Sequence, residues 1–229
     1  RPVTEKAGEG HFVLNEKTSI TSNEKNSFNL KYLKGKIEAA SGFKLAEANS
    51  SDKSIVLSLN PDQSIKPEGY ILDITTEGIT IKASSSAGIF YGIQSLLQLM
   101  PASVYSGRST AADKWRLSSV HIEDYPRFGY RGMMLDVSRT FFNAETVKKY
   151  IDWLSHHKIN TPHWHLSDDN GWRVEIKKYP LLTEKGAWRG DNEVLAPSFG
   201  SGKARYGGFY TQNEIKEIVK FAAERNIEI

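Results

Sequence analysis

The sequence predicts two parts with different architectures: a small α+β layer over residues 1–125, then the beginning of a parallel α/β sheet or barrel over residues 126–229. Two observations predict this division. Strand-like segments in antiparallel order and two amphipathic helices, joined by short turns, fill the first part. In the second part, near-continuous apolar strands alternate with amphipathic helices. A length of 229 residues fits one large domain or two small ones.

Composition narrows the class of protein. Hydrophobic residues make up 39% of the chain and aromatic residues 11%, which is enough for a packed core and argues against a disordered protein. The net charge of +3 is not gathered in a Lys/Arg block, so we expect no nucleic-acid partner. Cysteine is absent, which excludes disulfides, thiolate catalysis and cysteine-based zinc sites. No run of 18 apolar residues occurs, so we expect no membrane span.

The first part begins with a short strand candidate at 12–14. Apolar residues at helical spacing predict a helix over 26–40, which a Ser-Gly pair would end. Residues 54–59 alternate like a strand and stop at an Asn-Pro turn, and residues 70–74 and 79–83 form a hairpin pattern around a glycine-containing turn. This order of elements predicts an α+β layer.

The first part ends with a second helix over 87–99, which Pro101 would stop, and with a connector over 120–126. The second part then opens on residues 132–137, whose apolar run is typical of a buried parallel strand. Asn143 can cap the helix that follows, and a second strand is expected over 161–166.

The last segment predicts one more helix and the start of a third strand. Thr211 and Glu214 have the spacing of a capping box, followed by apolar residues on one helix face. The apolar alternation at 225–229 resembles the first residues of a strand. Because domains seldom end by starting an element, we expect this chain to be a piece of a longer protein.

Chemistry in parallel α/β folds gathers where strands end. Residues 136–142 and 163–172 follow the two predicted strands and are rich in polar and aromatic side chains. Four of the five tryptophans fall between 153 and 188, and aromatic faces beside carboxylates and an arginine suit a sugar. We therefore expect a carbohydrate site at these strand ends.

Two residues are the main candidates, and each has a structural alternative. Arg139 could grip two sugar hydroxyls, a phosphate or a carboxylate, or it could form a purely structural ion pair with Asp136 or Asp168. Asp168 and Asp169 are adjacent, so on an extended segment they point in opposite directions and only one would face a substrate. The alternative is a turn, because Asp-Asp-Asn-Gly is favourable turn chemistry.

A metal site is the weaker hypothesis for the same region. His163 and His165 would share a face of a strand, a spacing compatible with metal ligation, and Asp168 could add an oxygen ligand. The alternative is that both imidazoles line a barrel interior and hydrogen-bond there. No third nitrogen ligand or well-placed carboxylate from another strand is identifiable.

Two long motifs resemble the family 20 β-N-acetylhexosaminidases. They are the stretch RGMMLDVSR at 131–139 and the stretch HWHLSDDNGWR at 163–173, and YTQNEI at 210–215 is similar to the start of a helix in that family. Residues 88–99 resemble the last helix of the family's small α+β domain. The resemblance runs from about residue 69 to the end of the chain, and we expect it to extend back to the start.

The resemblance implies a TIM (β/α)₈ barrel after the α+β domain, of which residues 126–229 would form two βα units and the start of strand three. It implies that Arg139 binds hydroxyls of a terminal N-acetylhexosamine and that Asp168 belongs to the same substrate-binding site. The family needs no metal, and no cofactor is expected.

The family's chemistry is retaining and substrate-assisted, with an Asp-Glu pair at the end of the fourth barrel strand. No position of this chain matches that pair, which would lie beyond Ile229, so we expect no catalytic residue here and an inactive fragment of an exo-acting hydrolase. Two other functions stay open: a non-catalytic carbohydrate-binding or interaction module, and a metal-dependent α/β hydrolase using His163 and His165.

The expected partner is a glycan or oligosaccharide that ends in N-acetylhexosamine. We expect an extracytoplasmic protein, whether periplasmic, on the cell surface or secreted. A barrel edge left without its next strand is prone to pair with another chain, so self-association is also expected.

Overall fold

The computed structural model describes residues 2–24, 27–47, 53–61, 64–108, 115–198 and 201–229. The chain divides into two compact units, Arg1–Gly129 and Tyr130–Ile229. Within the described residues, every helix is too short or too polar to cross a membrane.

The first unit is built on a seven-stranded sheet in the order β1-β7-β5-β6-β4-β2-β3. Its strands are β1 (Thr4–Val13), β2 (Ser19–Ser22), β3 (Ala46–Glu47), β4 (Ser54–Leu59), β5 (Tyr70–Ile74), β6 (Gly78–Ala83) and β7 (Arg116–Asp124). The expected β5–β6 hairpin is confirmed, but the purely antiparallel order is wrong. Strand β6 lies between β5 and β4, and it is antiparallel to β5 but parallel to β4. Strand β2 is also parallel to both of its neighbours, β3 and β4.

Two further expectations for this sheet are wrong. The candidate strand at 12–14 is only the end of β1, and most of the expected connector at 120–126 belongs to β7. Strand β7 lies between β1 and β5 and pairs with both, with Ile122 opposite Leu72 of β5. Its hydrogen-bonding partners are distant in the sequence, so local periodicity did not reveal it.

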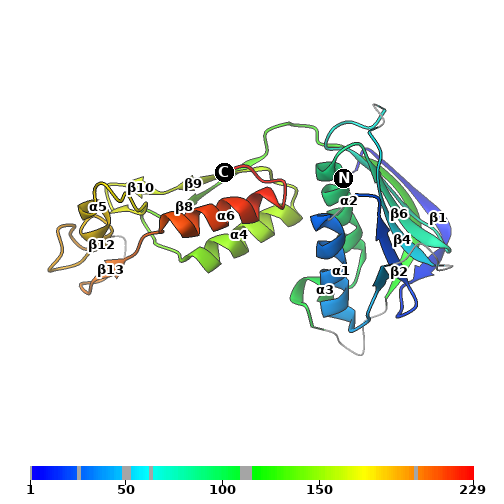
Figure 1. Ribbon diagram of the computed structural model, residues 1–229, viewed down its shortest axis with the longest axis horizontal. Helices are drawn as coiled ribbons and strands as arrows, with labels where there is room; N and C mark the ends of the chain where they lie inside the picture. Colours follow the sequence, from blue (N-terminus) through cyan, green and yellow to red (C-terminus); the bar gives the residue numbers. More distant parts are fainter. Residues whose placement is uncertain (1, 25–26, 48–52, 62–63, 109–114, 199–200) are drawn as a thin grey trace. The chain divides into compact units, whose positions relative to one another are not determined.

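Two long helices, α1 (Phe28–Ser41) and α2 (Ser86–Leu99), lie against the same face of this sheet, and the short helix α3 (Ser103–Ser106) follows (Figure 1). Both expected helices are confirmed, although residue 26 lies outside the described residues. Ser27 and Ser85 cap α1 and α2 with their side-chain oxygens, and Gly42 ends α1 in the left-handed conformation at φ +77°.

Helix α2 packs on the sheet so closely that a glycine is needed in its first turn. A Cβ atom on Gly88 would lie 2.8 Å from the Cβ of Ala83 and would overlap the carbonyl oxygen of Gly69. Most of α2 is buried, including fully buried Phe90 and Ile93, which belong to the main core of the unit. The close contact therefore allows α2 to bury its apolar face completely.

The second unit is an alternation of parallel strands and helices. Strands β8 (Gly132–Asp136) and β9 (Thr161–His165) are parallel neighbours, and α4 (Ala144–His156) connects them. The smaller elements are β10 (Ser167–Asp168), β11 (Gly171–Trp172), α5 (Leu181–Glu184), β12 (Trp188–Arg189) and β13 (Tyr206–Gly207), and α6 (Gln212–Ala223) comes last. The two expected strands and two expected helices of this part are therefore confirmed.

Alternation along β8 and β9 separates an apolar face from a polar one. Leu135 and Trp164 are paired in register and pack with Val147 and Ile151 of α4 in the core of the unit. The opposite face carries Met134, His163 and, at the strand ends, Asp136 and His165. Met133 and Met134 are more than half exposed, so β8 is less buried than its apolar run predicted.

The termini of α4 and α6 form as expected. The side chain of Asn143 accepts a hydrogen bond from the backbone N–H of Thr146, and Thr211 and Glu214 form a reciprocal capping box. The expected third strand at the end of the chain is wrong, because residues 227–229 are not in a strand. They are tied to the start of β9 through a hydrogen bond from the Glu228 N–H to the Asn160 carbonyl oxygen, 2.9 Å long.

Candidate functional site

Arg139 lies between two carboxylates just beyond the end of β8. Its Nη1 is 2.9 Å from Oδ2 of Asp136, and its Nη2 is 2.7 Å from Oδ2 of Asp168. The side chain of Arg139 is nevertheless 39% exposed. The ion pairs with Asp136 and Asp168 that the sequence suggested as a structural alternative are therefore present, but they leave the Arg139 guanidinium accessible to a ligand.

The turn after β8 is shaped by Asp136 itself. Its Oδ1 accepts hydrogen bonds from the backbone N–H groups of Ser138 and Arg139, each 3.0 Å long. Aspartate commonly binds the backbone two or three residues ahead in such turns. One carboxylate thus sets the backbone that carries Arg139 and also pairs with its guanidinium.

Asp168 reaches Arg139 from the neighbouring strand end. It lies in β10, which pairs with β11 across a turn at 169–170, so the turn interpretation is confirmed, and the Asp168 side chain in this turn contacts Arg139. Oδ2 of Asp168 is also 2.9 Å from Nε2 of His165, and its Oδ1 accepts the backbone N–H of Asp169. Asp168 is therefore held on three sides.

These contacts stabilise the charged forms of the site. Burial raises the pKa of Asp136, but hydrogen bonds from the backbone and guanidinium of Arg139 outweigh that effect and leave the pKa below its ordinary value. Hydrogen bonds from the Asp169 N–H and from His165 lower the pKa of Asp168. The hydrogen bond to Asp136 raises the pKa of Arg139. Both carboxylates are consequently ionised at neutral pH.

The two lowered carboxyl pKa values predict a definite pH dependence. Because the folded-state values lie below 3.8, the ordinary value, the ion pairs are fully formed above that pH and are lost as the pH falls through the lowered values. Carbon-13 NMR titration of the side-chain carboxyls should place both midpoints below 3.8. An Arg139→Met variant should move the Asp136 midpoint upward, and a midpoint for wild-type Asp136 at or above 3.8 would contradict the geometry.

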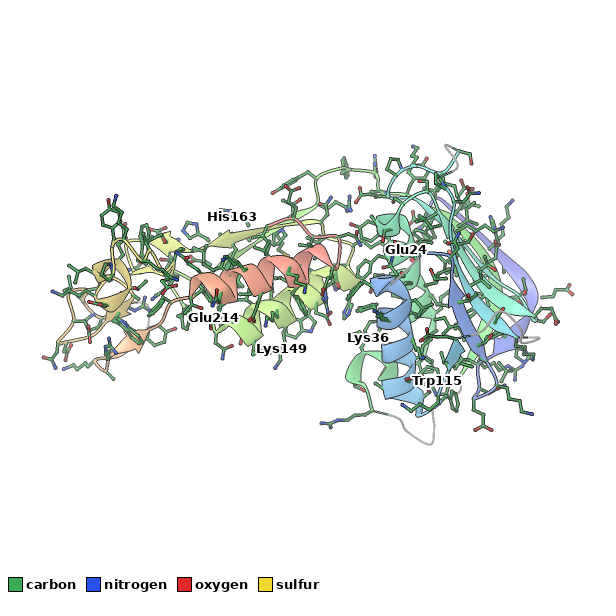
Figure 2. The ribbon with its side chains drawn as sticks, viewed as in Figure 1. Glu24, Lys36, Trp115, Lys149, His163 and Glu214 are labelled. Atoms are coloured by element: carbon green, nitrogen blue, oxygen red, sulfur yellow. The ribbon has the colours of Figure 1, made fainter. Side chains whose placement is uncertain are left out.

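The two histidines share the polar face of β9, as their spacing predicted. Their ring centroids are 5.4 Å apart in an edge-to-face arrangement, and His163 points away from α4 and α6 (Figure 2). Nε2 of His165 faces the Asp168 carboxylate. Among the described residues, no three His, Asp or Glu side chains come together as a metal site would require.

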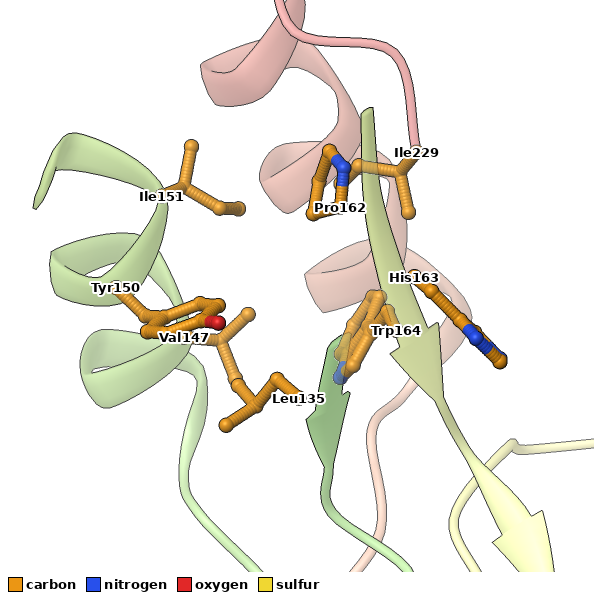
Figure 3. Close-up of a pocket in the computed structure, with 8 residues that line it drawn as sticks. All are labelled: Leu135, Val147, Tyr150, Ile151, Pro162, His163, Trp164 and Ile229. Carbon is orange, nitrogen blue, oxygen red and sulfur yellow. The ribbon is translucent and has the colours of Figure 1, made fainter. Parts of the chain in front are cut away.

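Of the four tryptophans between 153 and 188, Trp172 lies in β11 beside the strand of Asp168, but the other three do not gather there as expected. Trp164 points to the other side of β9 and lines a small apolar pocket against α4, opposite His163 (Figure 3). Trp153 is 63% exposed on α4, and Trp188 stacks with Arg205, whose Cζ lies 3.7 Å from the ring centroid. Strand alternation and helix position separate side chains that are close in the sequence. Tryptophans that cluster in the sequence therefore do not form one aromatic surface in the structure.

Sequence reasoning overlooked one residue beside the site, Arg173. It is fully buried, although arginine in a polar stretch gives no sign of burial. The available signal was indirect: Gly171 precedes it by two residues, and a Cβ there would overlap the Arg173 guanidinium. His165 was considered as a metal ligand, but the structure shows it as the partner of Asp168.

The fold and these strand ends define a class of protein: an α+β domain followed by βα units whose strand ends carry a cluster of charged side chains. Two family models make the class specific. The catalytic domain of glycosyl hydrolase family 20 matches residues 128–229, and domain 2 of the same family matches residues 1–125. The chain belongs to glycosyl hydrolase family 20.

Relatives of known name agree with this assignment. A β-hexosaminidase of Vibrio furnissii is 45% identical over 175 residues, which are 76% of this chain and 27% of the relative. A β-hexosaminidase of Porphyromonas gingivalis is 39% identical over 222 residues, 95% of this chain and 27% of the relative. The chain thus spans about a quarter of the length of these curated relatives.

Solved structures match nearly the whole chain. The exo-β-N-acetylglucosaminidase of Vibrio harveyi, solved with N-acetylglucosamine, superposes with a TM-score of 0.89 at 38% identity and covers 99% of this chain and 34% of its own. The β-N-acetylhexosaminidase of Streptomyces coelicolor A3(2) superposes with a TM-score of 0.86 at 35% identity, covering 99% of this chain and 44% of its own.

Proposed function

We propose that this chain is the N-terminal part of an exo-acting, retaining β-N-acetylhexosaminidase, which removes terminal non-reducing N-acetyl-β-hexosamine residues from glycans. The observation that carries this proposal is the accessible Arg139 guanidinium held between Asp136 and Asp168 at two neighbouring strand ends. The names of the relatives, and the N-acetylglucosamine bound to the Vibrio harveyi enzyme, support the same substrate class.

The chemistry of the site suits adjacent sugar hydroxyls. Each terminal nitrogen of a guanidinium carries two N–H groups, and the two carboxylates account for one contact at each nitrogen. A guanidinium is also a planar fork of five donors, whose geometry can match the oxygens of two neighbouring hydroxyls. Asp168 is an acceptor for a hydroxyl hydrogen, so donor and acceptor meet on one sugar ring.

The reaction follows the substrate-assisted route that the family implies. The acetamido oxygen of the substrate attacks the anomeric carbon as the glycosidic bond breaks, and a glutamic acid protonates the leaving oxygen. Water then opens the oxazolinium ring, with the same glutamate as base, and the β configuration is retained. An aspartate beside that glutamate orients the acetamido group.

In this reaction, Arg139 and Asp168 bind the sugar and perform no proton transfer. No position among the 229 residues matches the family's Asp-Glu pair. We therefore propose that these residues supply part of the sugar pocket and that the isolated chain is inactive. We place the enzyme outside the cytoplasm, and we propose that the isolated chain self-associates through the barrel edge that lacks its next strand.

The test is release of 4-nitrophenol from its N-acetyl-β-glucosaminide. A polypeptide of the relatives' length that contains this sequence should release it, whereas the purified 229-residue chain should not. Failure of the longer polypeptide would refute the proposed activity, and turnover by the short chain would refute its assignment as a non-catalytic part. Light scattering of the short chain measures its self-association.

A further inference from the structure

Arg173 is a buried arginine held by backbone carbonyl groups. Its side chain is fully buried, and in the described part of the chain no ion pair includes it. Instead, Nε donates to the Val137 carbonyl at 3.0 Å, and Nη2 donates to the Ser138 carbonyl at 2.6 Å. Nη1 donates to the carbonyls of Ala187 at 2.5 Å and Gly208 at 3.0 Å.

Those four carbonyls come from three stretches of the chain, which form two structural regions. Val137 and Ser138 are the two residues that precede Arg139, immediately after β8. Ala187 and Gly208 flank the paired strands β12 and β13. The guanidinium therefore ties the backbone that carries Arg139 to the β12–β13 pair, and a planar group with five donors can do this where a flexible ammonium cannot.

The backbone of Arg173 connects the same region to Asp168. Arg173 directly follows β11, which pairs with β10 and so with Asp168. Its N–H donates to the Leu166 carbonyl at 3.1 Å, and its own carbonyl accepts the N–H of Tyr210 at 2.8 Å. In addition, Ser138 is buried and its hydroxyl donates to the Gly171 carbonyl at 2.8 Å. Hydrogen bonds of Arg173 and Ser138 thus connect the backbone that follows β8 with the backbone that follows β9.

Two glycines leave the space that this arrangement needs. A Cβ on Gly171 would lie 2.7 Å from Nη1 of Arg173 and closer still to Cζ. Gly207 has φ +148°, and a Cβ there would overlap the Ala187 carbonyl oxygen that Arg173 binds. A side chain at position 171 would therefore push the guanidinium away from the carbonyl groups that it binds.

Burying this cation is costly, which argues for a role beyond packing. Burial lowers the pKa of Arg173, and the positive charge of buried Arg189 lowers it further. A buried charge needs several good hydrogen bonds to offset desolvation, and Arg173 has them only because it joins these particular carbonyls. An apolar side chain would fill the space but could not set the positions of four carbonyl groups.

We propose that Arg173 is a positioning residue for the sugar site: it fixes the Val137–Ser138 backbone so that the Arg139 guanidinium lies between Asp136 and Asp168. The inference rests on the proposed function, because its consequence is measured as sugar binding. It assigns Arg173 no contact with the substrate. Loss of Arg173 should therefore weaken binding of the sugar while the reacting groups elsewhere stay intact.

The test uses the longer enzyme with 4-nitrophenyl N-acetyl-β-glucosaminide as substrate. Arg173→Lys keeps the charge but cannot reach four carbonyls, so we expect KM to rise at least tenfold with a smaller change in kcat. Gly171→Ala keeps Arg173 but displaces its guanidinium, so it should raise KM similarly. The double variant should be little worse than either single variant, because both changes disrupt the same contacts.

The matched control is Arg225→Met. Arg225 is also a buried arginine of the second unit, but it binds Asp152 and the Phe221 carbonyl on the helices, away from the strand ends. Its loss should lower thermal stability and leave KM unchanged. If Arg225→Met raises KM as much as Arg173→Lys does, the effect is general destabilisation and the proposal is overturned.

Other outcomes separate the inference from the function. An active wild-type enzyme whose KM stays within twofold in both Arg173→Lys and Gly171→Ala overturns the positioning role alone. A wild-type enzyme without activity overturns the proposed function instead. If Arg173→Lys does not fold, Gly171→Ala decides the question, supported by carbon-13 NMR of this chain, in which the Asp136 carboxyl should then titrate at higher pH than in wild type.

Discussion

Replacing Arg139 with Met is expected to reduce kcat/KM of the longer enzyme by about 10²–10⁴-fold. Two hydrogen bonds from a charged group to sugar hydroxyls contribute roughly 3–6 kcal/mol together, and each 1.4 kcal/mol is a factor of about ten. The methionine would also leave Asp136 and Asp168 without the cation that lies 2.9 Å and 2.7 Å from them. Steady-state kinetics with the 4-nitrophenyl substrate measures the effect.

Two companion variants sharpen this result. Arg139→Lys should be nearly as poor as Arg139→Met, because an ammonium group cannot hold both carboxylates and two hydroxyls in one plane. Arg116→Met is the control: Arg116 is an exposed arginine of the first unit that contacts His11, and its loss should leave kcat/KM unchanged. A folded Arg139→Met enzyme within threefold of wild type would remove Arg139 from the sugar site.

Replacing Gly88 with Ala is expected to destabilise the first unit by about 1–3 kcal/mol, the cost of overpacking a tight contact. This reverses the usual sign, because Gly→Ala inside a helix ordinarily stabilises by roughly 0.5–1 kcal/mol. The reason is steric, since the new Cβ would meet the Gly69 carbonyl and Ala83 where α2 lies on the sheet. Hydrogen-exchange mass spectrometry of α2 peptides in rising urea reports the opening free energy of this unit.

Gly35 provides the matched substitution. It lies in α1, and a Cβ at this position would meet no atom within 4 Å. Gly35→Ala should therefore stabilise the unit by roughly 0.5–1 kcal/mol through the lower backbone entropy of the unfolded chain. If the two substitutions changed stability in the same direction, the close packing of α2 would not be the reason for a glycine at position 88.

Local signals in the sequence were sufficient for much of the fold. Helices α1, α2, α4 and α6 have apolar residues at helical spacing and side-chain caps within three residues of the groups they bind. The β5–β6 hairpin likewise joins residues that are neighbours along the chain. Each of these features depends on interactions between residues that are close in the sequence, so the sequence is sufficient to predict it.

Elements whose partners are distant were missed or wrongly placed. Strand β7 looked like a connector because its partners in β1 and β5 lie far away in the sequence. The end of the chain looked like a strand from its alternation alone, but residues 227–229 have a single backbone hydrogen bond to Asn160 in place of a strand ladder. Strand formation requires a neighbour, and periodicity does not identify one.

The site divides in the same way. The sequence by itself determined the family resemblance, the candidates Arg139 and Asp168, and the shared face of His163 and His165. Only the tertiary structure decided that Arg139 bridges Asp136 and Asp168, that His165 supports Asp168, and that Arg173 is buried under the strand ends. Those contacts join separate segments of the chain, and a hydrogen bond depends on distances and angles that exist only once the backbone of both segments is in place.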